Sequence, residues 1–326
     1  MCCACGLLVW SSAVLAADWN RFRGPNGSGV SDARALPIVF GPKTNLLWKT
    51  DAPQGSSSPI VAGGRVWLAG CEENRLLLRC LDRKSGQLLW ERSIEAARTQ
   101  RKSQPNDAAS STPVTDGRNV YALFSGFGLV SYTIAGRERW RIPLGPFDQP
   151  HGMASSPILT EGAIIVLADQ VTDSYIAAFD PAKGKLKWKA PRASLVGGYS
   201  TPLMCAGELI VSGPLELVAY QNVLYLLKDG GILTSVNPEN GEVQRRERLE
   251  GAVERYFASP VAGDGKVYAV SEAGKVAVIK AGAQWQLLAM NDLGEACYAT
   301  PALAEGQILL RTKRTLWAFG GTANLK

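Results

Sequence analysis

Six residues of this chain carry side chains suited to ligand binding or proton transfer, and all of them stand near predicted turns. They are Asn106, His151, Tyr199, Lys228, Tyr256 and Tyr298. His151 is the only histidine among 326 residues, and no nearby Ser or Cys forms a nucleophile motif with it, which argues against general-base catalysis. A set of Tyr, Asn, Lys and His side chains instead suits the binding of a polar ligand or a peptide.

The three tyrosines also have a structural interpretation. Each stands two or three residues before a Ser/Thr-Pro pair, at 201–202, 259–260 and 300–301. An aromatic ring that recurs at one place in a repeat is typical of packing, and we weigh packing above binding for these three.

The cysteines do not indicate a zinc or haem site. Seven are present, and the four that follow the N-terminal leader, Cys71, Cys80, Cys205 and Cys297, form no C-x-x-C pair. Cys71 and Cys80 flank a predicted turn, but that turn places Cys80 opposite Trp67. A Cys71–Cys80 disulfide, which needs Cβ atoms about 4 Å apart, stays an open alternative.

A repeated sequence pattern predicts where these residues lie in the fold. Six Ser/Thr-Pro pairs open similar stretches, with prolines at 59, 113, 157, 202, 260 and 301, so the steps are 54, 44, 45, 58 and 41 residues. A recurrence at this spacing indicates a repeat architecture.

Each complete copy predicts four short strands. In the first copy they cover 58–61, 65–70, 75–81 and 87–93, and Gly, Asp or Asn residues occupy the turns between them. Four-stranded antiparallel sheets repeated around an axis make an all-β propeller. In such a fold, the loops that carry the six candidate residues ring one mouth of the central channel, where variable loops favour binding.

A Gly followed four residues later by Trp marks the outermost strand. The pairs are Gly86 with Trp90, Gly136 with Trp140, and Gly184 with Trp188. We interpret each Trp as a ring that packs against the neighbouring blade. The fifth copy has Arg245 at the Trp position.

The ends of the repeat predict ring closure. The last copy stops after three strands, and residues 45–50 resemble an orphan fourth strand, so the N-terminal strand should complete the last blade and remove its open edge. Near residue 220 two strands are missing. We expect three strands after Pro202, to about Tyr220, followed by the second strand of another blade. The resulting 26 strands allow six blades with one irregular member or seven blades with a defect.

Composition predicts one exported domain. Residues 1–17 are typical of a signal peptide without a basic start, 18–44 form a lead segment, 45–320 the propeller and 321–326 a tail. We expect the lead segment to contribute little to stability. The apolar leader is too short to span a bilayer. The net charge of +6 is scattered along outer strands and turns, which argues against nucleic-acid binding.

The phrases DRKSGQLLW, DPAKGKLKW and NPENGEVQRR resemble the repeat of the pyrroloquinoline-quinone (PQQ) propeller family, and the lead WNRFRGPNGSG is similar to that of secreted PQQ-like propellers of unassigned role. One branch of the family contains PQQ- and Ca²⁺-dependent alcohol dehydrogenases with a vicinal Cys-Cys over the quinone. Here the only Cys-Cys lies in the leader, and no Glu/Asn/Asp cluster for Ca²⁺ is recognisable.

The other branch resembles the propeller lipoprotein of the outer-membrane barrel assembly machinery, a non-enzymatic scaffold. No Cys follows the predicted cleavage site of this chain, so no lipid anchor is indicated. The resemblance implies a periplasmic or secreted, non-catalytic propeller that binds a protein or other ligand in the cell envelope and has no cofactor. The alternative is a PQQ-dependent oxidoreductase or an inactive relative of one.

Overall fold

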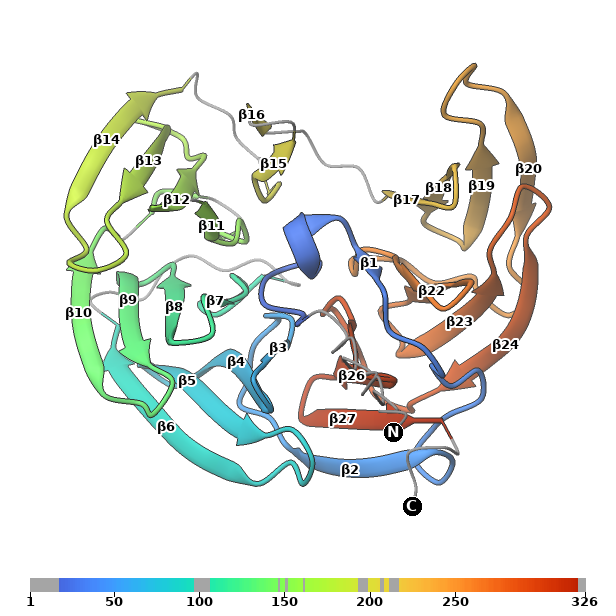
Figure 1. Cartoon of the computed structure of the whole chain (residues 1–326), viewed down its shortest axis with the longest axis horizontal. Coiled ribbons are helices and arrows are strands. Elements are labelled where there is room, and N and C mark those ends of the chain that lie inside the picture. Colours follow the sequence, from blue (N-terminus) through green and yellow to red (C-terminus); the bar gives the residue numbers. More distant parts are fainter. Residues whose placement is uncertain are drawn as a thin grey trace, which may run out of the picture.

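The structure, a computed structural model, describes residues 18–96, 106–145, 147–149, 152–160, 162–192, 199–205, 208–210 and 217–321. These residues form seven sheets arranged around a common centre (Figure 1). The predicted all-β propeller is confirmed. The strands of each blade pair antiparallel, and in the six four-stranded blades the innermost strand is the shortest.

The blades follow the order of the chain. Blade 1 contains β3 (Ile60–Ala62), β4 (Arg65–Glu72), β5 (Arg75–Asp82) and β6 (Leu88–Glu95), and blade 2 contains β7 (Val114–Thr115), β8 (Asn119–Phe124), β9 (Gly128–Thr133) and β10 (Glu138–Pro143). Blade 3 contains β11 (Ile158–Thr160), β12 (Ala163–Ala168), β13 (Tyr175–Phe179) and β14 (Leu186–Pro191), and blade 4 contains β15 (Leu203–Cys205) and β16 (Glu208–Ile210).

The second half closes the ring. Blade 5 contains β17 (Leu217–Tyr220), β18 (Val223–Lys228), β19 (Ile232–Val236) and β20 (Val243–Arg248), and blade 6 contains β21 (Val261–Gly263), β22 (Lys266–Val270), β23 (Lys275–Lys280) and β24 (Gln286–Asp292). Blade 7 contains β25 (Ala302–Ala304), β26 (Gln307–Arg311), β27 (Thr315–Gly320) and the N-terminal β2 (Leu46–Asp51). The short helix η1 (Pro25–Gly27) and β1 (Val30–Ser31) precede them.

Seven blade positions are present, and blade 4 has two strands among the described residues. Our assignment of the segment that ends at Tyr220 was wrong. We expected it to be a third strand, but β17 is the innermost strand of blade 5 and lies beside β21. Its Val218 is buried in the core that blades 5 and 6 share, which is the environment of an innermost strand. Among the described residues, the positions without a strand are therefore the third and fourth of blade 4.

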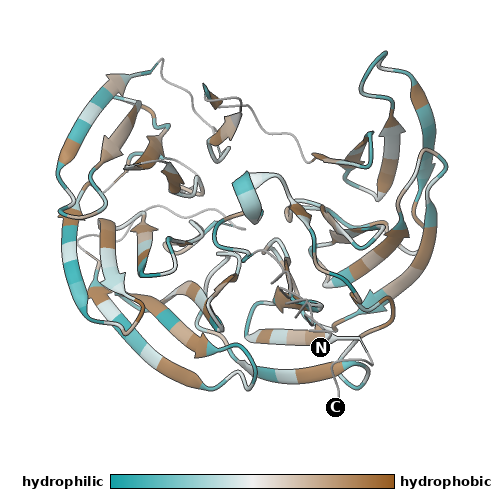
Figure 2. Ribbon diagram, viewed as in Figure 1, coloured by the Kyte–Doolittle hydropathy of each residue, from teal (hydrophilic) through white to brown (hydrophobic). Residues whose placement is uncertain are grey.

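Stacking of blades explains the burial pattern. The second strands of the four-stranded blades other than blade 5 are buried along almost their whole length, because a neighbouring blade covers each face. The outer strands alternate between hydrophilic and hydrophobic residues, as Figure 2 shows. Within blade 1, Cys80 lies opposite Trp67 as predicted and Cys71 lies opposite Leu76, and no disulfide joins the two cysteines.

Trp90 and Trp140 dock on the next blade as we predicted, and Trp48 does the same, whereas Trp188, for which we predicted the same role, is 42% exposed. The indole N–H of Trp48 donates to Arg83 O (2.8 Å), that of Trp90 to Ile134 O (2.9 Å) and that of Trp140 to Pro181 O (3.1 Å). Each ring lies against the glycine of that blade's outer turn, Gly86, Gly136 or Gly184. One glycine and one tryptophan thus form a seam at each of three junctions: between blades 7 and 1, blades 1 and 2, and blades 2 and 3.

These seams predict an asymmetry between two glycines with similar backbone geometry. Gly86 has φ +71° and Gly241 has φ +74°, but a Cβ at Gly86 would overlap the Trp48 ring whereas one at Gly241 would meet nothing within 4 Å. Both alanine variants should carry left-handed strain of about 1–2 kcal/mol. Gly86→Ala should lose a further amount of about 1–3 kcal/mol through overpacking, measured by urea unfolding. Equal losses would show that the tryptophan seam does not constrain the turn.

The Ser/Thr-Pro openings link the innermost strands through hydroxyl groups. Ser58 N donates to Thr112 Oγ1 (3.0 Å), Thr112 N to Ser156 Oγ (2.9 Å), Ser156 N to Thr201 Oγ1 (3.0 Å), Ser259 N to Thr300 Oγ1 (3.0 Å), and Thr300 N to Ser58 Oγ (3.0 Å). The repeated phrase thus exists because each hydroxyl accepts the backbone N–H of the preceding blade.

Ring closure uses the N-terminal strand, as predicted. β2 pairs antiparallel with β27, and Trp48 lies opposite Ala318. The junction of blades 7 and 1 also holds the buried Arg311, whose guanidinium donates to Ser57 O, Ala69 O and Pro53 O at 3.0, 2.7 and 2.8 Å. Burial lowers the pKa of Arg311 to about 10, so the side chain is still a cation at neutral pH.

The lead segment contacts every blade, which corrects our expectation that it contributes little. It contacts the blades through hydrogen bonds, most of which lie near the C-terminal ends of the innermost strands. Three carbonyl groups of the segment accept: Trp19 O from Val61 N (2.8 Å, blade 1), Asn20 O from Thr115 N (3.0 Å, blade 2) and Gly29 O from Ala262 N (2.7 Å, blade 6). Four side chains of the segment donate to carbonyl groups of the remaining blades. They are Arg21 to Leu159 O (3.1 Å, blade 3), Asn26 to Met204 O (3.0 Å, blade 4), Arg23 to Leu217 O (2.6 Å, blade 5) and Ser31 to Leu303 O (2.8 Å, blade 7).

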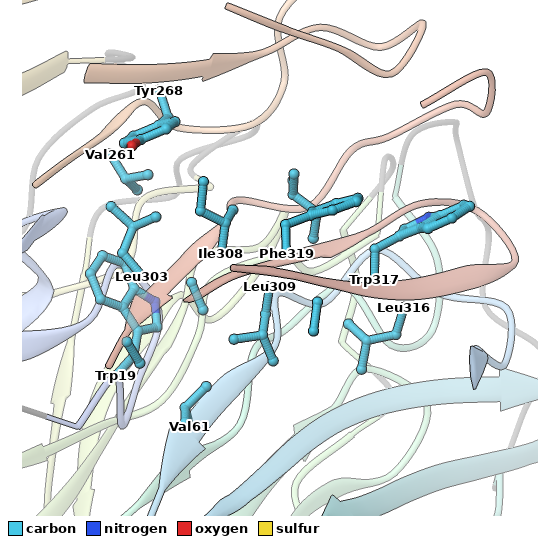
Figure 3. Close-up of a cluster of buried hydrophobic side chains, with 14 of the residues drawn as sticks. Trp19, Val61, Val261, Tyr268, Leu303, Ile308, Leu309, Leu316, Trp317 and Phe319 are labelled. Atoms are coloured by element: carbon cyan, nitrogen blue, oxygen red, sulfur yellow. The ribbon is translucent and has the colours of Figure 1, made fainter. Parts of the chain in front are cut away.

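This segment, residues 19–31, crosses the centre of the ring (Figure 1). Trp19 is fully buried, and Figure 3 shows its ring close to Leu303 and Val61 of two neighbouring blades. Polar main chain at the centre of the propeller finds partners in this way. The segment therefore covers the end of the channel at which the innermost strands finish.

Candidate binding face

The mouth of the channel that residues 19–31 do not cover lies at the opposite end of the innermost strands. It is built from the loops that join one blade to the next and from the turns between second and third strands, because both sets lie at the end where innermost strands begin. Loops displayed by a rigid scaffold are where binding residues concentrate. Of the predicted candidate residues, Asn106, Tyr199, Tyr256 and Tyr298 lie in these loops, and Lys228 ends β18 beside one of these turns.

Three side chains from two blade-to-blade loops contact one another at this mouth. The Phe257 and Tyr298 rings have centroids 5.8 Å apart at an angle of 57°, and the Arg255 guanidinium lies 5.5 Å from the Phe257 centroid. Phe257 is 36% exposed and the neighbouring Val253 is 67% exposed. We call Arg255, Phe257 and Tyr298, with the exposed Val253 and Lys228, the mouth patch.

Hydrogen bonds donated by main-chain N–H groups hold the loops of the mouth patch together. Gly230 N donates to Glu254 O (2.9 Å) and Tyr256 N donates to the Asp229 carboxylate (2.9 Å), which joins the turn beside Lys228 to the patch. Glu272 N donates to Arg255 O (2.8 Å), and Cys297 N donates to Glu272 O (3.1 Å). Loops from blades 5, 6 and 7 thus form one fixed surface, whose exposed rings need little ordering before they bind.

The candidate residues fall into separate groups. Lys228 is exposed, Tyr298 is half-buried in the mouth patch, and Tyr256 between them is 6% exposed within the core, which agrees with a packing role. Asn106 is half-buried and lies against Gly152, whereas His151 lies outside the described residues. Tyr199 is half-buried, and burial raises its pKa.

Sequence reasoning missed Phe257 and gave no role to Arg255. The signal was present as an Arg and a Phe that flank Tyr256 shortly before a Ser-Pro pair. Their stacking depends on Tyr298, 41 residues further along the chain, so the sequence alone could not place the three together.

Carboxylates at this mouth already bind protein donors. They are Asp107 (from Ser56), Asp169 (from Arg192), Asp229 (from Tyr256 N), Glu272 (from Arg255) and Glu295 (from Thr312 and Arg314). Burial opposes ionisation of Glu295, but hydrogen bonds from Thr312 and Arg314 outweigh it and hold its pKa below the usual value.

Metal-ligating side chains do not cluster among the described residues. No group of three His, Cys, Asp or Glu side chains within them lies close enough together to hold a metal ion. The acidic groups that a calcium ion would need are engaged by the donors named above. Within the same part of the chain, no helix is long and apolar enough to cross a membrane.

The fold and the repeats define the class: a seven-position propeller with PQQ-type repeats. The family described as outer membrane protein assembly factor BamB matches residues 44–135 and 77–321. Because these matches span most of the chain, the protein belongs to that family. No curated protein matches the chain.

Solved propellers resemble this structure at low sequence identity. BamB from Moraxella catarrhalis is 13% identical over 85% of this chain and 97% of that chain, with a TM-score of 0.47. The Pan2 WD40 domain of Neurospora crassa is 10% identical over 85% and 95%, with a TM-score of 0.54. The RRP9 WD40 repeats are 8% identical over 83% and 97%, with a TM-score of 0.55. The two WD40 structures support the propeller fold alone.

Proposed function

We propose that the chain is an exported, non-catalytic scaffold that binds a protein partner in the cell envelope through the mouth patch. The observation that supports this proposal most directly is the contact among Arg255, Phe257 and Tyr298 at the mouth that residues 19–31 leave uncovered. Membership of a family described as an outer membrane assembly factor supports an envelope location and a protein partner.

The chemistry of the mouth patch suits a protein surface better than a small molecule. Aromatic and Arg side chains supply most of the binding energy in protein interfaces. Phe257 and Val253 are exposed on the surface, and the Arg255 side chain, which also pairs with Glu272, adds a cation beside them. An apolar surface beside two cations, Arg255 and Lys228, fits a partner that presents apolar side chains beside a carboxylate.

The mouth patch makes a prediction for partner binding. The double variant Arg255→Ala/Phe257→Ala should weaken the complex with a partner recovered from envelope extracts by about 2–4 kcal/mol, as loss of interface hot spots does. Quantitative pull-down with purified partner measures the change. The matched control is Lys84→Ala/Lys183→Ala, which alters exposed outer turns at the opposite end. A partner that depends on those lysines but not on Phe257 would contradict the proposal.

The non-catalytic part of the proposal has its own test. Incubation of the folded protein with PQQ and Ca²⁺ should produce no reduction of an artificial electron acceptor with alcohols or sugars. The reason is that the mouth carboxylates are engaged by protein donors. Turnover that requires both PQQ and Ca²⁺ would establish the quinoprotein alternative.

A further inference from the structure

Blade 4 offers an unpaired strand edge. β16 pairs with β15, and no other described strand lies beside it, whereas the second strand of every other blade pairs on both edges. Ile210 on β16 is exposed. An open edge of this kind presents backbone N–H and C=O groups that can pair with an incoming strand.

One face of blade 5 is only partly covered. Along β18 and β19, buried residues such as Tyr225 and Leu233 alternate with half-exposed ones. The buried set packs on blade 6, so the half-exposed set faces blade 4. It consists of Leu224, Leu226, Ile232, Thr234 and Val236. Four aliphatic side chains on this face therefore lack the cover that a complete blade 4 would supply.

Among the described residues, the contact between a tryptophan and a glycine turn that joins neighbouring blades is missing on both sides of blade 4. Trp188, which ends the repeat of blade 3, is 42% exposed, whereas Trp48 in a complete seam is 8% exposed. On the other side, a Cβ at Gly241 would meet no atom within 4 Å, although the equivalent Gly86 lies against a Trp ring. Among the described residues, no glycine turn receives the Trp188 ring, and no large side chain packs on Gly241.

The outer strands beside the vacant position are basic. β14 carries Lys187 and Lys189 with no acidic residue, and β20 carries three Arg and one Glu. By contrast, β6 in blade 1 carries two Glu and one Arg. An acidic outer strand between β14 and β20 would complement this charge.

We propose that blade 4 accepts a two-stranded β-hairpin from a partner protein. The inner strand of the hairpin pairs with β16 and covers Leu224, Leu226 and Ile232. Its turn carries a glycine that receives Trp188. Its outer strand is acidic and carries a Trp four residues after that glycine, which docks over Gly241. This site is separate from the mouth patch and does not depend on it.

A hairpin of this chain supplies a matched probe. The 75–95 segment of blade 1 contains two strands, the Asp82–Gly86 turn and Trp90 at the required spacing. We would synthesise it with Cys80→Ser, and also with Arg92→Glu or with Glu91→Lys/Glu95→Lys to vary the outer charge. Fluorescence anisotropy of the labelled peptide with the intact protein gives Kd, and hydrogen exchange follows residues 208–210.

Binding should be saturable, should protect the amides of 208–210, and should follow the order Arg92→Glu, parent, then Glu91→Lys/Glu95→Lys. Trp188→Ala in the protein should weaken binding about thirtyfold or more, the loss typical of an interface hot spot. The matched control is Leu88→Ala in the protein, on the exposed outer strand of blade 1. This variant should bind the unchanged peptide with the wild-type Kd.

Several outcomes would overturn the proposal. They are absence of binding by natively folded protein, insensitivity to Trp188→Ala, and a reversed charge order. A dimer that protects 208–210 without peptide would identify a second copy of this chain as the occupant instead.

Discussion

A variant that begins at residue 32 should fail to form a stable propeller, although it retains every blade strand. Residues 19–31 supply a hydrogen-bonding partner to each of the seven blades and bury Trp19 completely. Their loss leaves apolar surface and main-chain groups at the centre exposed to water. Trp19→Ala alone should cost about 3–5 kcal/mol, the range for a buried Trp.

Circular dichroism and urea unfolding measure this effect. Val39→Ser, at an exposed site in the same N-terminal region, should unfold at the same urea concentration as the wild type. If the variant that begins at residue 32 unfolds with the wild-type midpoint, residues 19–31 are a peripheral attachment and the covered end of the channel has no structural importance.

Removal of the closing strand should have an effect of similar size. Without residues 46–51, β27 becomes an open edge and the seam between Trp48 and Gly86 is lost. Trp48→Ala alone should cost about 3–5 kcal/mol of unfolding free energy. Exposure of the β27 edge should also promote association between chains, which light scattering detects.

Trp188→Ala is the matched control for Trp48→Ala, because Trp188 occupies the same repeat position in blade 3. It is largely exposed and has no docking turn among the described residues, so its replacement should change stability little. Equal losses for the two variants would show that the seam does not determine the stability of the ring.

The sequence predicted the elements whose signals are local. The strands of blade 1 start and end within two residues of their predicted positions at every boundary, because alternating apolar residues and glycine turns lie within one repeat. The resemblance of residues 45–50 to an outer strand also predicted ring closure by β2. The fixed distance to a glycine also predicted the docking role of Trp90 and Trp140, but not the exposure of Trp188.

Contacts between distant segments were decided by the tertiary structure. Ser31 and Leu303 are 272 residues apart, and nothing in the lead segment indicates that it reaches all seven blades. The composition of the segment that ends at Tyr220 suits both a third strand of blade 4 and an innermost strand of blade 5. Only its packing beside β21 identifies it as the innermost strand. Likewise, Arg255 and Phe257 became a candidate site only through Tyr298. By itself, the sequence determined the repeated unit, because strand alternation and turn chemistry act over a few residues. The three-dimensional packing decided which units meet, because the energy of those contacts depends on surfaces that form only when the ring closes.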